Sequence, residues 1–219
     1  MLKSRKHVFW EALIVTIFIF GVGILFGIYI ENQRTNEISE LYLVSEIDLL
    51  DVRIQTDLLG LENLNCGEAV RKNIEFADRV YQDAVTLEQY EDVSSLTDSL
   101  VSQHKRYDLL RTLLWLNSIK IKERCGEESF HTVVYLYEYQ TEDLEKESKQ
   151  IVFSNFLAEL KEEKKEEIIL IPIARNLNIG SLELLTKNYG INETSIIVDE
   201  DLTVYELNEL EKIRDYLDN

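Results

Sequence analysis

The feature that most constrains this chain is an apolar run at residues 8–30, VFWEALIVTIFIFGVGILFGIYI. After Glu11 no charged residue occurs for 19 positions, from Ala12 to Ile30. A helix rises about 1.5 Å per residue, so this stretch is long enough to cross a hydrocarbon core of about 30 Å. The run therefore predicts a transmembrane helix whose side chains contact membrane lipid.

The charges on either side of the run predict its orientation. Lys3, Arg5 and Lys6 precede it, and positively charged flanks normally stay in the cytoplasm. We therefore expect residues 1–7 to form a cytoplasmic tail and everything after residue 30 to be extracytoplasmic. The predicted location is the cell membrane, with a single pass.

A cleavable signal peptide is the alternative interpretation of the same run. Signal peptides have apolar regions of about 7–15 residues that end at small residues, whereas this run is longer and ends at Gly27-Ile28-Tyr29-Ile30. An uncleaved signal anchor is therefore favoured. Gly23 and Gly27 are four residues apart, a spacing that lets two membrane helices approach closely, so they are candidate dimer contacts.

Charge excludes one class of partner. Three of the 23 basic residues and one of the 41 acidic residues lie at or before residue 30, which leaves 20 basic and 40 acidic residues after it. A phosphate backbone would be repelled by this surface, so we expect no nucleic acid partner. A single proline and eight glycines in the whole chain favour long helices over flexible linkers.

The first part of the extracytoplasmic region has helical periodicity. Residues 31–65 are predicted to form an amphipathic stalk, because apolar residues recur there at spacings of four, three, four and four. These residues are Leu43, Ile47, Leu50, Ile54 and Leu58. Residues 66–125 have two further helical stretches, which we expect to form an antiparallel hairpin that turns near residue 93.

From residue 131 onward the pattern changes to short runs of β-branched and aromatic residues. Strands are predicted at 132–137, 168–173, 195–198 and 203–205, and helices at about 142–165, 180–189 and 207–217. The order β-α-β-α-β-β-α is typical of a small sheet with helices on both faces, so the fold class is α/β.

The two cysteines begin and end the predicted hairpin. Cys66 starts its first helix and Cys125 ends its second, so an antiparallel arrangement brings both to the same end. An oxidising exterior favours a disulfide between them. The alternative is a reactive pair with Cys66 activated by its helix N-terminus, although no C-x-x-C spacing is present.

Residues 189–198, Tyr-Gly-Ile-Asn-Glu-Thr-Ser-Ile-Ile-Val, resemble a thioredoxin-like motif, Y-G-V-x-x-x-P-T followed by an apolar strand. The closing helix at 207–217 also fits that family. The whole layout is similar to membrane-anchored archaeal proteins in which a helical segment precedes such a domain. The resemblance implies that 131–219 form a four-stranded mixed sheet flanked by helices.

The resemblance fails at the residues that carry redox chemistry. The C-x-x-C position corresponds here to Gln140, Thr141, Glu142 and Asp143, and the cis-proline position corresponds to Ser195. Thiol–disulfide exchange needs an attacking thiolate, so the resemblance implies a domain kept for its fold. We therefore expect an interaction or assembly module with a protein partner or self-association, no catalytic residue and no cofactor.

Two rival functions stay open at this point. One is an envelope thiol–disulfide oxidoreductase that uses Cys66 and Cys125, and the other is a helper subunit that holds an active redox partner. A metal centre is not expected, because His7, His104 and His131 are scattered without ligand spacing.

Three further features bear on the surface of this domain. Asn192 begins an N-x-T sequon and is a candidate glycosylation site. Tyr135, Tyr137 and Tyr139 alternate along the first strand, which predicts that they fill one face of the sheet or, alternatively, form a strip that binds a peptide. Pro172 lies in the second strand, and a proline is tolerated there chiefly at a sheet edge.

Overall fold

A computed structural model describes residues 5–60, 64–91, 98–126 and 130–218 of the chain. The chain divides into two compact units, Met1–Ile47 and Asp48–Asn219, which are described separately. Helix α1 spans Arg5–Leu58 and so contributes residues to both.

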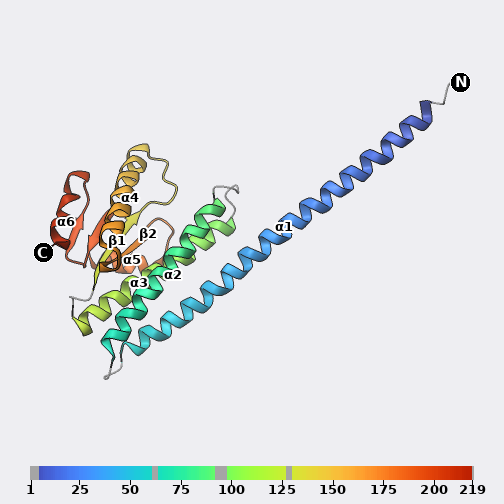
Figure 1. Cartoon of the computed structure of the whole chain (residues 1–219). Coiled ribbons are helices and arrows are strands. Elements are labelled where there is room, and N and C mark those ends of the chain that lie inside the picture. Colours follow the sequence, from blue (N-terminus) through green and yellow to red (C-terminus); the bar gives the residue numbers. More distant parts are fainter. Residues whose placement is uncertain (1–4, 61–63, 92–97, 127–129, 219) are drawn as a thin grey trace. The chain divides into compact units, whose positions relative to one another are not determined.

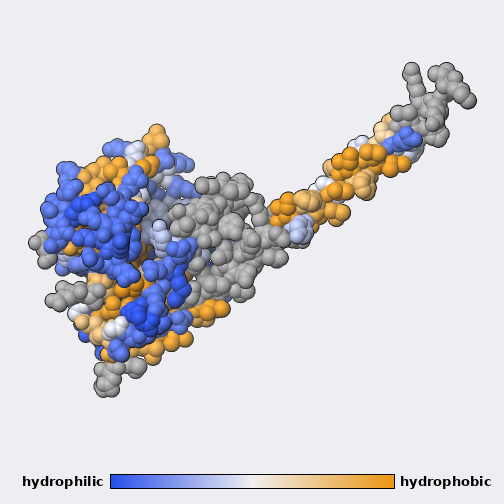
Figure 2. All heavy atoms as spheres, viewed as in Figure 1, coloured by the Kyte–Doolittle hydropathy of each residue, from blue (hydrophilic) through white to orange (hydrophobic). Residues whose placement is uncertain are grey.

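The first unit consists of the N-terminal part of α1. Its segment Phe9–Ile30, 22 residues long, is by length and composition sufficient to cross a membrane. Figure 2 shows the hydrophobic side chains of this segment at the surface of the helix. A Cβ added to Gly23 or Gly27 would meet no atom within 4 Å in this chain. The predicted helix is confirmed, and its insertion in a membrane stays a prediction.

The second unit begins with three helices. After the end of α1 come α2, Cys66–Glu91, and α3, Asp98–Cys125, which lie side by side (Figure 1). Asn65 starts α2 by accepting a hydrogen bond from the backbone N–H of Glu68 at 3.2 Å, a typical N-cap contact. The predicted turn near residue 93 lies outside the described residues.

The predicted apolar stripe on α1 is not the face that packs against the rest of the unit. Leu50, Ile54 and Leu58 remain exposed, whereas Val52 and Leu59 are buried. Between these two, Thr56 donates a hydrogen bond to Asn117 Oδ1 of α3 at 2.6 Å. The contact face is thus set by Val52, Thr56 and Leu59, a pattern that apolar periodicity alone does not select. Leu43 lies outside the described side chains.

The rest of the unit is a four-stranded sheet of order β2-β1-β3-β4. Its strands are β1, His131–Tyr137; β2, Ile168–Ala174; β3, Ser195–Val198; and β4, Leu202–Val204. Strands β1 and β2 are parallel, while β3 is antiparallel to both of its neighbours. The predicted mixed sheet is confirmed, and β2 lies at its edge, where Pro172 was expected.

Helices cover both faces of the sheet. They are α4, Leu144–Lys164; α5, Gly180–Asn188; and α6, Glu211–Leu217, with short 3-10 turns η2, Lys165–Glu167, and η3, Leu207–Glu209. The predicted closing helix is therefore divided into η3 and α6. The order of strands and helices agrees with the sequence pattern.

Each face of the sheet has its own hydrophobic core. On one face, Phe153 and Leu157 of α4 pack with Ile213 of α6. On the other, Leu110, Leu114 and other residues of the hairpin pack against the sheet together with α5. The hairpin and the sheet consequently share a core, which fixes α3 beneath the strands.

Candidate functional site

The segment expected to match the redox motif forms a turn and a helix cap. Gln140 has a positive φ of 51°, and Thr141 and Glu142 lead from it to Asp143. The carboxylate of Asp143 accepts hydrogen bonds from the backbone N–H groups of Glu145 at 3.0 Å and Lys146 at 3.3 Å. These contacts satisfy backbone donors at the start of α4. A structural role explains Asp143 fully.

Ion-paired side chains line a hollow beside this turn. The Glu138 carboxylate contacts Lys146 Nζ at 3.0 Å and Arg175 Nη1 at 3.3 Å. Gln150 holds the backbone of Glu138, accepting from its N–H at 2.6 Å and donating to its carbonyl at 3.2 Å. The hollow has a volume of about 210 Å³ and is also lined by Thr194.

The position expected to match the cis-proline, Ser195, lies at the start of β3. Ser195 is fully buried, and its hydroxyl donates to the carbonyl of Glu193 at 3.2 Å. The described residues contain no cis peptide bond.

Asn192, the candidate glycosylation site, is exposed, and its carbonyl accepts a hydrogen bond from Arg175. Its glycosylation stays a prediction.

The cysteines lie far from this turn in the fold. Cys66 and Cys125 form a disulfide with a Cα–Cα distance of 5.5 Å, within the range of unstrained bridges. It joins the start of α2 to the end of α3, as predicted. Since the sequence contains only these two cysteines, no free thiol remains near residues 140–143.

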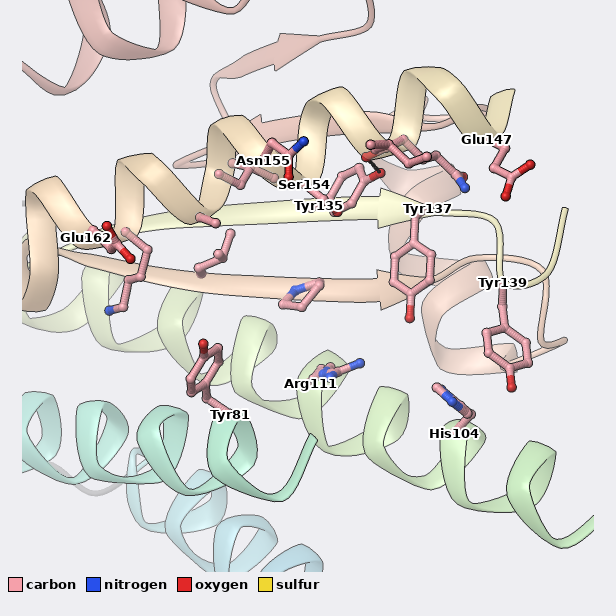
Figure 3. A pocket seen from close by; sticks show the side chains of 17 residues that line it. Tyr81, His104, Arg111, Tyr135, Tyr137, Tyr139, Glu147, Ser154, Asn155 and Glu162 are labelled. Carbon is pink, nitrogen blue, oxygen red and sulfur yellow. Dashed lines mark hydrogen bonds between the residues drawn. The ribbon is translucent and has the colours of Figure 1, made fainter. Parts of the chain in front are cut away.

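A larger cavity, here called the tyrosine groove, follows the free edge of β2. It has a volume of about 670 Å³ and lies between α4 on one side and the α2–α3 hairpin on the other (Figure 3). Its lining includes Tyr135 and Tyr137 of β1, Leu170 and Pro172 of β2, and Tyr139 just after β1. Helices α2 and α3 contribute Tyr81, His104 and Arg111.

The three alternating tyrosines differ in burial. Tyr135 is buried, packs edge-on against Phe153, and donates a hydrogen bond to the carbonyl of Gln150 at 3.3 Å. Burial raises the pKa of Tyr135, so it stays a neutral phenol. Tyr137 stacks on Tyr135 with ring centroids 5.6 Å apart, and Tyr139 lies 4.2 Å from the His104 ring. Tyr137 and Tyr139 thus line the groove as members of two ring pairs.

A buried ion pair supports the hairpin side of the groove. Asp108 is fully buried and contacts Arg111 Nη1 at 3.0 Å. Burial raises the pKa of the Asp108 carboxyl, while the Arg111 charge acts against this rise. Sequence reasoning missed this cluster, although His104, Asp108 and Arg111 are four and three residues apart and so share one face of α3.

A second polar cluster, here called the Asp199 cluster, lies at the other end of the sheet. Asp199 accepts hydrogen bonds from Lys122 Nζ and from the backbone N–H of Thr132 at 2.7 Å, and it contacts His131 Nδ1 at 2.5 Å. Burial would raise the pKa of Asp199, but these hydrogen bonds outweigh it and the pKa is lowered. The cluster joins α3 to the turn between β3 and β4.

Known proteins offer no guide to either cluster or to the groove. Neither a family model, nor a curated protein, nor a solved structure matches the chain. Within the described residues, no group of three or more His, Cys, Asp or Glu side chains is placed to hold a metal ion. The functional conclusion therefore depends on the geometry of this chain alone.

Proposed function

We propose that this protein is a single-pass, membrane-anchored interaction or assembly module whose extracytoplasmic part carries a redox-inactive thioredoxin-like domain at 131–219. Support for the domain comes from its element order and from the parallel β1–β2 pair at one side of a β2-β1-β3-β4 sheet, which agree with the resemblance of residues 189–198. Support for the anchor comes from the apolar segment Phe9–Ile30 and its basic flank.

The observation that carries the proposal is the separation of sulfur from the expected redox position. Both cysteines are joined to each other at the base of the helical hairpin, while the hollow beside residues 140–143 is lined by the ion-paired side chains of Glu138, Lys146 and Arg175. Exchange chemistry requires a thiolate next to the bound substrate. A domain without a thiolate at this position can still bind partners through its surface, and one of its two large cavities, of about 670 Å³, is the tyrosine groove.

Sidedness is tested by thiol trapping in intact cells with a membrane-impermeant maleimide. We expect no labelling of the native chain until an impermeant reductant is added, because both thiols are outside and bridged. In a Cys66→Ala/Cys125→Ala background, an added cysteine at exposed Lys187 should be labelled, whereas His7→Cys should not. Labelling of the His7→Cys variant in intact cells would contradict the orientation.

Redox inactivity is tested by reduction of insulin with the purified full-length chain in detergent. In the presence of dithiothreitol we expect insulin to precipitate at the same rate with the native chain and with the Cys66→Ala/Cys125→Ala variant. The reason is that the disulfide does not lie beside a site where a substrate for thiol–disulfide exchange would bind. A rate that falls when Cys66 is removed would favour the oxidoreductase instead.

A further inference from the structure

A short part of the free edge of β2 has outward-facing backbone groups without a hydrogen-bond partner among the described residues. Arg175 donates its backbone N–H to Tyr137 of β1 at 2.8 Å, and alternate residues of a strand turn their backbone groups the same way. The backbone N–H and C=O groups of Ile169, Ile171 and Ile173 therefore point toward β1. The backbone groups of the residues between them point away from β1, toward the groove. Outward groups of an edge strand are a template for pairing with another extended chain.

Side chains close both ends of this edge. At one end Lys161 Nζ donates to the carbonyl of Ile168 at 2.8 Å. At the other end the backbone N–H of Ala174 lies near the buried Asp108 carboxyl. Leu170 and Pro172 lie between these ends and are the two partly exposed residues of an otherwise buried strand.

Within this part of the edge, one residue can pair with an added strand through both its backbone N–H and its carbonyl. Pro172 has no N–H, so it offers its carbonyl alone, while Leu170 offers both a donor and an acceptor. No described residue supplies a partner for these outward groups. A polypeptide backbone is the ligand that satisfies a donor and an acceptor at this spacing, as in strand addition to a sheet edge.

Charges on the rim specify the ends of such a segment. Glu147 and Glu162 of α4 are exposed, and they lie at opposite ends of the groove (Figure 3). They are 15 residues apart, about 22 Å along a helix. Six steps of about 3.3 Å in an extended chain cover nearly this distance, so the first and seventh residues of a bound segment would reach the two carboxylates.

The middle of the groove specifies the centre of the segment. In an extended chain the fourth residue points away from the face that carries the first and seventh. It would therefore face the hairpin side, where Arg111 lies between Tyr81 and His104 (Figure 3). An aromatic or large apolar side chain fits this position, because ring–ring contacts supply both area and orientation.

We infer that the tyrosine groove binds an extended segment of a partner protein, about seven residues long, with Lys or Arg at both ends and an aromatic or apolar residue at its centre, paired with Leu170 as an added strand. This inference rests on the proposed interaction function and names the class of partner. The net charge of the chain, −18, steers a basic segment toward it.

The test uses a fluorescein-labelled peptide, Lys-Thr-Val-Phe-Val-Thr-Lys, and the full-length chain in lipid nanodiscs, with binding followed by fluorescence anisotropy. We expect saturable binding that weakens as salt is raised. The same peptide with Glu at both ends should fail to bind, and a peptide N-methylated at its central residues should bind far more weakly, because strand pairing is blocked.

Variants locate the binding to the groove. Glu147→Gln/Glu162→Gln should weaken binding about tenfold at low salt, the size expected for the loss of two exposed ion pairs, whereas Glu142→Gln/Glu166→Gln carries the same charge change outside the groove and should not. Pro172→Val adds an outward N–H and should tighten binding. Retention of the disulfide and an unchanged circular dichroism spectrum verify that each variant folds.

The outcomes separate the inference from the function on which it rests. Binding that is insensitive to all three groove changes would overturn the inference and leave a docking function on another surface. Failure of the peptide to bind at all would also overturn the inference. The proposed function itself fails only if the sidedness or insulin results are reversed.

Discussion

Replacement of both Cys66 and Cys125 by alanine is expected to lower the free energy of unfolding by about 4 kcal/mol. The bridge closes a loop with a sequence separation of 59 residues, and the chain-entropy model gives a stabilisation of this size for such a loop. The measurement is urea denaturation of the full-length chain in detergent. Fluorescence of Trp115, which is fully buried on α3, reports unfolding in a Trp10→Phe background.

Reduction of the native chain with a phosphine should reproduce the loss seen in the double variant, because the same cross-link is removed without a change of side chain. A loss below about 1 kcal/mol in both experiments would contradict the view that the bridge stabilises the hairpin through the unfolded state. In that case the helices would have to be held in place by their core packing alone.

The disulfide and the element order were predictable because both depend on local patterns. Cys66 and Cys125 mark helix ends, so an antiparallel hairpin was enough to bring them together. The strand runs are short and β-branched, and they alternate with helical periodicity, so the sheet followed from sequence. Pro172 indicated the edge strand since its missing N–H cannot be used inside a sheet.

The tyrosine groove was not predictable, because it is created by segments that sequence patterns do not relate. Tyr81, Arg111 and Pro172 come from α2, α3 and β2, and their proximity depends on how the hairpin packs beneath the sheet. The prediction of which face of α1 packs against the other helices was wrong for a similar reason. Leu50 and Ile54 form the stronger apolar stripe, but Val52 and Leu59 fit the neighbouring helices.

The two walls of the groove are held by different means. On one side α4 packs on the sheet through Phe153 and Leu157. On the other side α3 is held at its C-terminal end by the disulfide to α2 and by the contact of Lys122 with Asp199. Because these restraints lie away from the groove, they position its hairpin wall without occupying the groove itself.

Lys122→Met is expected to destabilise the fold by about 3 kcal/mol, because it leaves the largely buried Asp199 carboxylate without its lysine partner. The change removes the ammonium and keeps an unbranched apolar side chain that ends at Cε. Exposed Lys187→Met is the matched control and should change stability by less than about 0.5 kcal/mol. The measurement is the same urea titration with Trp115 fluorescence.

Asp199→Asn completes the test, since asparagine tolerates the positive φ of 49° at this position. The double variant Lys122→Met/Asp199→Asn should lose less stability than the sum of the two single losses, because neither charge is left buried alone. If the losses simply add, Lys122 and Asp199 do not act as a pair.

The Asp199 cluster also sets a pH dependence with a defined sign. The pKa of Asp199 is lowered from its ordinary 3.8 by the hydrogen bonds that the carboxylate accepts. Its ionised form therefore contributes stability that is present above about pH 4 and is lost as the pH falls through the lowered pKa. The native chain should thus lose more stability between pH 5 and pH 2 than Asp199→Asn, which has no proton to bind at this site. Equal acid sensitivity of the two chains would show that other carboxyls govern acid unfolding and that the cluster does not stabilise the ionised form of Asp199.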